Sequence, residues 1–239
     1  MAETTAPAAD ISIRELRTVD AVFAASRVLS EVWGGDGSGM PPNLLRALAH
    51  SGNYTVGVYD GDRMIGASAA FFAEPGARSM HSHITGILPV YRGHGIGHTL
   101  KRHQREWALS HGVERITWTF DPLVARNAHF NLRALGAHVV EYLVDHYGAM
   151  DDGVNRGDAS DRLLVEWNLT RPSTAAPDDA RVVASVAVPA DIEAVRAQSA
   201  QDAAAWRVRV RDAFLARLAG GLVVGGFDDT RGYLFVAAR

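Results

Sequence analysis

A glycine-rich turn between a strand-like segment and a helix-like segment constrains this chain more than any other feature. Residues 92–97 read RGHGIG; they follow the apolar segment 84–88 and Pro89 and precede a segment with helical periodicity. Glycines let the backbone approach an anion closely, and the N–H groups that begin a helix, together with its dipole, bind phosphate oxygens. Arg92 adds a charge-assisted contact. The turn therefore predicts a phosphate site, with a plain turn that begins a helix as the alternative.

A dinucleotide site is a second interpretation of the same turn. Asp121 ends the next predicted strand, about where a Rossmann unit places the acid that binds the ribose. However, the spacing is G-x-G-x-G, and His98 stands where the third glycine of the Rossmann fingerprint belongs. A predicted hairpin over residues 54–72 also precedes the turn, whereas a Rossmann unit opens with it. Both departures disfavour a nucleotide-binding oxidoreductase.

The composition excludes several other classes of protein. The 239 residues contain no cysteine, which excludes a disulfide framework, a thiol nucleophile and thiolate metal sites. The net charge of -3 gives no electrostatic sign of a nucleic-acid partner. No apolar run reaches the roughly 18 residues of a membrane helix, and residues 1–10 lack the basic and apolar regions of a signal peptide. We therefore expect a cytoplasmic protein with no membrane and no nucleic-acid partner.

The order of predicted elements divides the chain into four parts. Residues 1–10 are a loose tail, and residues 11–170 form one α/β domain. Residues 171–180 have the composition of a linker. Residues 181–239 predict a strand, one long helix over 190–219 and a hairpin. Because a βαββ unit of this size is marginal by itself, we expect it to pack on the first domain or to form a dimer interface. In the first domain, strands are expected at 11–16, 54–59, 64–72, 81–88, 115–120, 138–143 and 163–169, and helices at 18–32, 43–51, 95–111 and 125–135.

The turn and its flanks resemble motif A of the GNAT superfamily of acetyltransferases. Residues 87–100 (ILPVYRGHGIGHTL) present an apolar strand end, a proline, two residues, the R-G-x-G-x-G turn and a helix. The order of elements from 11 to 169 also matches the GNAT order, and parts of 118–167 resemble a branch of predicted GNAT proteins with a similar C-terminal extension. The resemblance implies the GNAT fold, a mixed and mostly antiparallel central sheet flanked by helices.

By this resemblance, the turn binds the diphosphate of coenzyme A, and acetyl-CoA or a related acyl-CoA is the cosubstrate. The strand end before the turn would pair with the pantetheine amides, as an added peptide strand does. Two asparagines four residues apart on the helix after 124 would lie against the pantetheine arm, with helix capping and solvent contact as the alternative. The cofactor-binding residues implied are Ile87, Leu88, Val90, Arg92, Gly93, His94, Gly95, Ile96, Gly97, His98, Asn127 and Asn131. Lys101, Arg102 and Arg105 could meet the 3′-phosphate or form a solvated helix face.

Two histidines on the strand before the turn are the candidate catalytic bases. His81 and His83 share one strand face because they are two residues apart, and an imidazole titrates near neutral pH. Their spacing also resembles arylalkylamine N-acetyltransferases, in which a histidine pair lies equally far before the motif-A arginine and relays the proton through water. The alternative is a half-exposed histidine without function. His81 with His83, or His94 with His98, could hold a metal, but neither pair has a convincing third ligand, so we expect none.

The general acid and the acceptor site are less clearly marked. Many GNAT proteins carry a tyrosine acid four residues before the glycine that ends the helix over 125–135, but this chain has Leu132 there. Tyr142 is the candidate substitute, and Tyr147 is a second. Asp121 could bind a substrate ammonium or cap the next turn. Trp33 begins the Gly- and Pro-rich loop 33–43, which we expect to shape the acceptor site.

These features predict an enzyme that moves an acyl group from acetyl-CoA, or a related acyl-CoA, to the primary amine of a small-molecule or amino-acid-like acceptor by direct attack. The main alternative is a GNAT-like domain that binds acyl-CoA without turnover, as a sensor or scaffold. A homodimer is compatible with the C-terminal unit.

Overall fold

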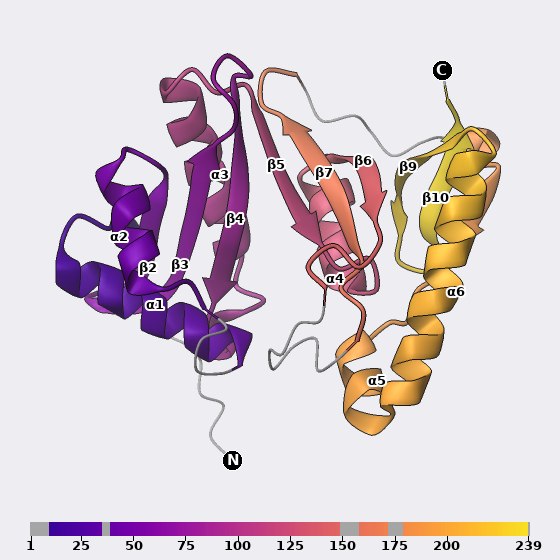
Figure 1. Ribbon diagram of the computed structural model, residues 1–239, viewed down its shortest axis with the longest axis horizontal. Coiled ribbons are helices and arrows are strands. Elements are labelled where there is room, and N and C mark those ends of the chain that lie inside the picture. Colours follow the sequence, from indigo (N-terminus) through magenta and orange to yellow (C-terminus); the bar gives the residue numbers. More distant parts are fainter. Residues whose placement is uncertain (1–9, 35–38, 149–157, 172–178, 239) are drawn as a thin grey trace. The chain divides into compact units, whose positions relative to one another are not determined.

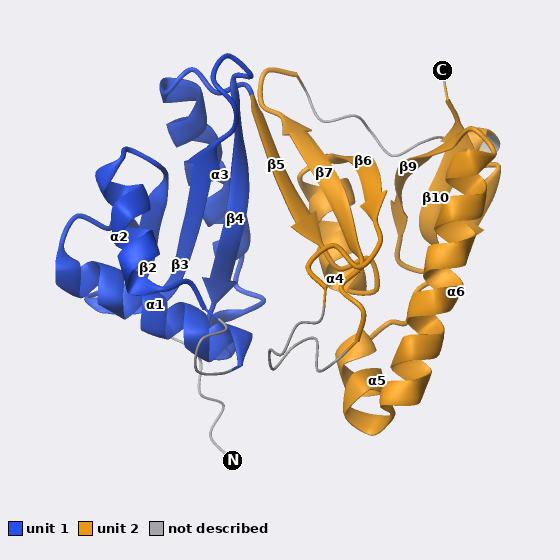
Figure 2. Ribbon diagram, viewed as in Figure 1, with its two compact units in different colours: residues 1–114 blue, residues 115–239 orange. Residues whose placement is uncertain are grey.

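The computed structural model describes residues 10–34, 39–148, 158–171 and 179–238, and these form two compact units. Unit 1 comprises residues 1–114 and unit 2 residues 115–239 (Figure 2). The division precedes the predicted strand at 115, whereas we expected a linker at 171–180. Residues 172–178 of that linker lie outside the described residues, so its role as a domain boundary stays a prediction.

Unit 1 is an antiparallel sheet covered by helices on both faces (Figure 1). Its strands pair in the order β1-β2-β3-β4. The middle strand β3 is buried from residue 65 to 70, as expected for a strand with both faces covered. The elements are β1 (Ile11–Glu15), α1 (Val19–Trp33), α2 (Pro42–His50), β2 (Thr55–Asp60), β3 (Arg63–Phe72), β4 (Ser79–Ile87), the short 3-10 helix η1 (Pro89–Tyr91) and α3 (Ile96–Ser110).

Helices α1 and α2 lie on one face of this sheet. The Thr18 side chain accepts a hydrogen bond from the Ala21 N–H and so caps the start of α1, and Gly34 ends the helix in a left-handed conformation. One face of α1 then packs on the strands, because its apolar residues recur at helical spacing. The buried core under these helices contains Leu16, Val22, Ala25, Leu29, Met40, Leu45, Ala67 and Ala69.

Unit 2 contains two antiparallel three-stranded groups, β5-β7-β6 and β8-β10-β9. Helix α6 packs against the second group, where the Phe214 ring lies 4.8 Å from Tyr233 and 5.1 Å from Phe235 between centroids. The elements are β5 (Arg115–Phe120), α4 (Ala125–Ala128), the π-helix η2 (His129–Ala134), β6 (His138–Leu143), β7 (Arg162–Asn168), the 3-10 helix η3 (Asp179–Arg181), β8 (Ala184–Val186), α5 (Ile192–Gln198), α6 (Ala200–Ala219), β9 (Leu222–Asp228) and β10 (Gly232–Ala237).

Two elements of unit 2 differ from the sequence prediction. The single helix expected over 190–219 is two helices, because Ser199 adopts an extended conformation and its side chain accepts a hydrogen bond from the Asp202 N–H. Ser199 thus ends α5 and caps α6, a role that serine fills well. The helix expected over 125–135 begins as one α-helical turn and continues as the wider η2.

The expected fold class is confirmed, since the chain is a mixed α/β protein whose strands are largely antiparallel and flanked by helices. Within the described residues, no helix combines the length and the apolar character needed to cross a bilayer.

Candidate functional site

The glycine turn presents open backbone at the start of α3. Gly93 and Gly95 have φ angles of 82° and 76°, a left-handed region that favours glycine. A Cβ atom at either position would meet no atom within 4 Å, so the space beside the turn is open. Gly95 is the N-cap of α3 and provides no side-chain cap for the first N–H groups of the helix. The turn therefore fits a phosphate group, for which those N–H groups are suitable donors.

The remaining residues of the turn divide into anchors and exposed groups. Ile96 and Leu88 are buried, and the Leu88 N–H donates to the Ile65 carbonyl at 2.9 Å. Because this N–H is already used, it is not a donor for a pantetheine amide. Arg92 is exposed, with its Nε donating to the Ile87 carbonyl at 3.4 Å. The other predicted cofactor residues of this segment are half-buried or exposed: Ile87, Val90, His94, Gly97 and His98.

The two candidate bases lie on the same face of β4, as their spacing predicts. The Phe71 ring lies 5.4 Å from His81 and 5.8 Å from His83, and the two imidazoles are 6.4 Å apart between centroids. The β3–β4 register pairs Ala69 with Ile84 but Ala70 with Ser82. His83 is therefore the extra residue of a β-bulge, a feature that redirects side chains and is frequent beside active sites.

The environment of His83 suits a base. Its side chain is exposed to solvent in part, and the partial burial of the ring lowers its pKa below the ordinary value of 6.5. Burial has this effect because it disfavours the charged imidazolium. A lowered pKa keeps the imidazole neutral, and so able to accept a proton, at neutral pH.

A buried polar cluster lies behind the bulge, on the opposite face of β4. The Lys101 ammonium on α3 donates to Ser82 Oγ at 3.2 Å and to Gln104 Oε1 at 2.9 Å, and Gln104 Nε2 donates to Ser82 Oγ at 3.2 Å. Burial lowers the pKa of Lys101 to about 7. Lys101 therefore points into unit 1, and our expectation that it could meet a phosphate from the helix surface was wrong. The signal was in the sequence, since Lys101 and Gln104 share the helical spacing of Gly97 and Ala108.

The two predicted cofactor asparagines of unit 2 lie on α4 and η2. Asn131 is buried and its carbonyl accepts a hydrogen bond from the Ala137 N–H, whereas Asn127 is half-buried. The change from α- to π-helix occurs between them. Single π-helical turns are frequent at functional sites, so the irregular helix is compatible with a binding role, which stays a prediction.

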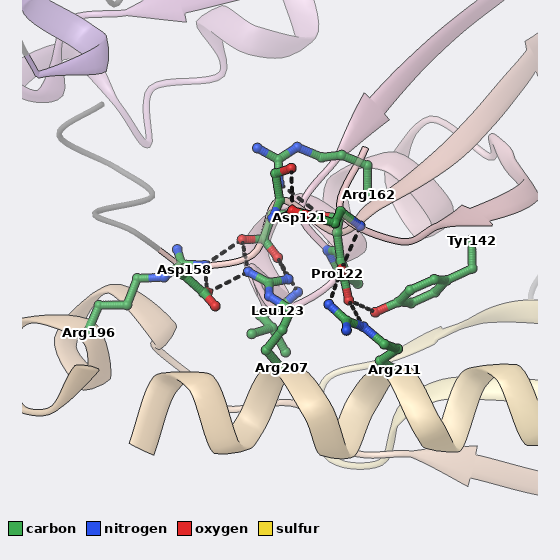
Figure 3. Close-up of polar contacts among 12 residues, drawn as sticks. Asp121, Pro122, Leu123, Tyr142, Asp158, Arg162, Arg196, Arg207 and Arg211 are labelled. Carbon is green, nitrogen blue, oxygen red and sulfur yellow. Dashed lines mark hydrogen bonds and ion pairs between the residues drawn. The ribbon is translucent and has the colours of Figure 1, made fainter. Parts of the chain in front are cut away.

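Asp121 at the end of β5 is held by two arginines (Figure 3). Its carboxylate receives hydrogen bonds from Arg207 at 2.6 and 2.9 Å and from Arg196 at 2.6 Å, and it caps the next turn by accepting from the Leu123 N–H at 2.9 Å. Burial alone would raise the pKa of Asp121, but the two guanidinium groups hold it at about 2. The structure thus shows the capping role, and a bond to a substrate ammonium would have to compete with two arginines.

Tyr142 on β6 donates its hydroxyl proton to Asp161 Oδ2 at 2.7 Å. Asp161 is fully buried and also binds Arg211 at 2.6 and 2.8 Å. Burial, and then the bond to Asp161, raise the pKa of the Tyr142 phenol. This environment opposes proton release, so the acid role of Tyr142 stays a prediction that its surroundings do not favour. Tyr147 is exposed, and its hydroxyl lies 2.9 Å from Thr119 Oγ1.

Trp33 is the last residue of α1 and is half-buried. Its indole N–H has no hydrogen-bond partner within the described part of the chain. Residues 35–38 of the loop that follows lie outside the described residues, so the acceptor role of Trp33 stays a prediction. In the parts that the structure describes, no three His, Asp or Glu side chains are grouped as metal ligands.

Sequence reasoning missed the charged residues that surround Asp121 and Tyr142. Arg207 and Arg196 also bind Asp158 Oδ2, at 2.8 and 3.1 Å. One signal was available: Arg207 follows Ala203 by four positions and precedes Phe214 by seven, which places it on the buried stripe of α6. An arginine on such a stripe is buried only when it is paired.

Comparison with known proteins identifies the family. The model of the acetyltransferase (GNAT) family matches residues 24–149, more than half of the chain. No curated protein gave a significant match.

Solved structures of acetyltransferases share this fold at low sequence identity. The ribosomal-protein-S18-alanine N-acetyltransferase from Escherichia coli is 12% identical with a TM-score of 0.55, over 68% of this chain and 96% of that chain. YncA from Salmonella typhimurium, whose structure contains its cofactor acetyl-CoA, is 16% identical with a TM-score of 0.53, over 71% and 99%. A GNAT-family acetyltransferase from Streptococcus pneumoniae is 15% identical with a TM-score of 0.54, over 66% and 98%. This chain is an enzyme of the GNAT acetyltransferase family, whose matched region includes the turn at residues 92–97.

Proposed function

We propose that this enzyme transfers the acetyl group of acetyl-CoA to the primary amine of a small-molecule or amino-acid-like acceptor, by direct attack of the amine. The observation that carries the proposal is the open turn at residues 92–97. Gly93 and Gly95 leave space beside the backbone, and the uncapped start of α3 offers N–H donors to a diphosphate. The family match over residues 24–149 supports the same cosubstrate.

His83 is the base in this proposal. A primary alkylammonium has a pKa near ~10.4, so an amine acceptor must lose a proton before it can attack. Bound acetyl-CoA supplies the activated acyl group, and the attack forms a C–N bond as the C–S bond to coenzyme A breaks. His83 takes the amine proton, because its lowered pKa keeps it neutral. His81, on the same face, is the second member of a relay through water.

The proton for the leaving thiolate has two candidate donors. The hydroxyl of Tyr142 donates its hydrogen bond to buried Asp161, whereas Tyr147 is exposed to solvent. Replacement of each tyrosine by phenylalanine separates them: the donor's variant loses turnover, and the loss shrinks when the leaving thiol has a lower pKa. The other variant keeps its turnover.

A domain that binds acyl-CoA without turnover is the second candidate. The observation that favours it is Leu132, which stands where many relatives carry the tyrosine acid.

Two assays test these proposals. Coenzyme A should raise the melting temperature of the protein and NAD should not, because only a ligand that binds the folded state stabilises it. Release of free thiol from acetyl-CoA, measured with a panel of small amines and with short peptides, then identifies turnover and the class of acceptor. Stabilisation by coenzyme A without thiol release from any amine would support the binding domain, and acetylation of peptides alone would contradict the small-molecule acceptor.

A further inference from the structure

The C-terminal segment, defined here as residues 179–238, holds the turn that connects β5 to α4. Arg207 binds the Asp121 carboxylate through two hydrogen bonds of 2.6 and 2.9 Å, and Arg196 adds a third at 2.6 Å. One residue further along, the Tyr233 hydroxyl on β10 donates to the Pro122 carbonyl at 2.8 Å. All of these groups are buried or nearly so. Three side chains from three C-terminal elements thus fix two consecutive residues of one turn, and Figure 3 shows the two arginines among them on Asp121.

The same segment also contacts the helix that follows this turn. Arg126 forms a bidentate pair with Glu193 at 2.6 and 2.8 Å. His129 Nδ1 lies 2.8 Å from Asp229, and Arg133 donates to Asp229 at 3.3 Å. These pairs are exposed, so each contributes little to stability. However, they join one side of the helix to α5 and to the β9–β10 turn.

The chemistry of these contacts is unusual for an extension that only packs. Burying Arg207 costs the free energy of desolvating a guanidinium, and a well-packed apolar side chain is often as stabilising as such an ion pair. What a bidentate pair adds is a fixed geometry, because the planar guanidinium matches the carboxylate in one orientation. The network therefore sets the position of the Asp121 turn more strictly than apolar packing would.

We propose that the C-terminal segment is a positioning element of the acyl-transfer site, with Arg207 as its principal residue. By holding Asp121, it fixes the turn over residues 121–124 and the helix that carries Asn127 and Asn131. The inference rests on the proposed function to the extent that these asparagines contact coenzyme A. The positioning itself depends only on contacts within unit 2.

The test uses the full-length protein with the variants Arg207→Ala and Arg207→Lys. Arg209→Ala is the matched control, because Arg209 lies on the same helix, is exposed and contacts only the Trp206 ring in the described residues, at 4.4 Å. Steady-state kinetics give KM for acetyl-CoA and kcat separately. Hydrogen exchange of the backbone amides compares residues 121–134 with residues 11–110.

We expect Arg207→Ala to raise KM for acetyl-CoA about tenfold with kcat changed less than about threefold, because binding contacts are misplaced while the base in unit 1 is intact. In Arg207→Ala, hydrogen exchange of the backbone amides should be faster than in the wild type at residues 121–134 and unchanged at residues 11–110. Millimolar guanidinium, which can occupy the vacated site, should restore KM for Arg207→Ala, and methylammonium should restore less. Arg209→Ala should match the wild type in every assay.

A wild-type KM in both Arg207 variants, or a lowered melting temperature with unchanged KM, overturns the proposal and leaves Arg207 a purely structural residue. If Arg207→Ala does not fold, Arg207→Lys decides, since it keeps the charge and loses the bidentate geometry. A wild-type protein that releases no thiol contradicts the proposed function instead. In that case hydrogen exchange alone decides the inference, with unchanged exchange at 121–134 in the variants overturning it.

Discussion

Arg207 on α6 donates hydrogen bonds to both carboxylate oxygens of Asp121 at the end of β5, although 86 positions separate the two residues in the chain. The pair lies within unit 2 and is shielded from solvent, so the loss of one partner leaves the other buried with only its second partner, Arg196 for Asp121 or Asp158 for Arg207.

The first prediction concerns this pair and stability. Arg207→Met should lower the free energy of unfolding, by less than the cost of about 3–5 kcal/mol for a fully unpaired buried charge, because Asp121 loses its bidentate partner but keeps Arg196. The double variant Asp121→Leu with Arg207→Met should lose less than the sum of the two single variants, since both charges are gone. Urea denaturation measures each value. Additive effects within about 0.5 kcal/mol would show that the pair is not coupled, contrary to the short distances.

The second prediction concerns the glycine turn. Gly95→Ala should lower the free energy of unfolding by about 1–2 kcal/mol, the usual cost of a left-handed conformation for a residue with a Cβ. It should also weaken coenzyme A binding, because the methyl group enters the open space beside the turn. The control is Gly52→Ala, where φ is 80° and a Cβ likewise meets no atom within 4 Å, but outside the turn. Calorimetric titration measures the affinity of each variant for coenzyme A. An equal loss of affinity in Gly95→Ala and Gly52→Ala would refute a phosphate role for the turn.

The third prediction concerns the pH dependence of turnover. The neutral form of His83 is the active base, and burial lowers its pKa. Plots of kcat/KM against pH should therefore rise to a plateau, with the midpoint of the rise below the ordinary pKa of 6.5. His83→Gln should lose most of the activity, about 100-fold or more for a general base, together with this rise. An unchanged profile in the variant would assign the base elsewhere, with His81→Gln as the next variant to measure.

The fourth prediction concerns Lys101 and alkaline stability. Burial lowers the pKa of its ammonium from 10.5 to about 7 in the folded state, so the unfolded chain binds more protons between these values. The free energy of unfolding should therefore rise with pH above about 7, and we would measure it up to about pH 9, below the range in which tyrosines ionise. Lys101→Met should remove this rise. A wild-type slope of zero in this interval would mean that Lys101 stays protonated through another contact.

The sequence predicts the local structure around the glycine turn well because its signals are local. The turn at residues 92–97, the preceding strand and the following helix are contiguous, and each has its own signal in glycine spacing or apolar periodicity. The shared face of His81 and His83 also follows from a two-residue spacing. By contrast, the β-bulge at His83 depends on how β4 pairs with β3, and the sequence of β4 alone does not predict it.

The remainder depends on contacts between distant positions. Nothing near Asp121 in the sequence indicates that Arg196 and Arg207 will occupy its carboxylate, so the sequence leaves a substrate role open beside the capping role that it slightly favours. The prediction of Tyr142 as the acid rests on its proximity in sequence to the usual position of the acid, and this proximity carries no information about its bond to Asp161. Ser199 differs from these residues because its capping of α6 is a local signal in the sequence. The apolar periodicity that continues across Ser199 nevertheless predicts one long helix in place of two.

Lys101 is the only lysine of the chain, and it is buried beneath β4. An enzyme that handles an acylating thioester therefore exposes no lysine side chain that the thioester could modify while the protein is folded. The same arrangement makes Lys101 a reporter of opening: an amine-reactive reagent would label this lysine side chain only at the rate at which unit 1 opens.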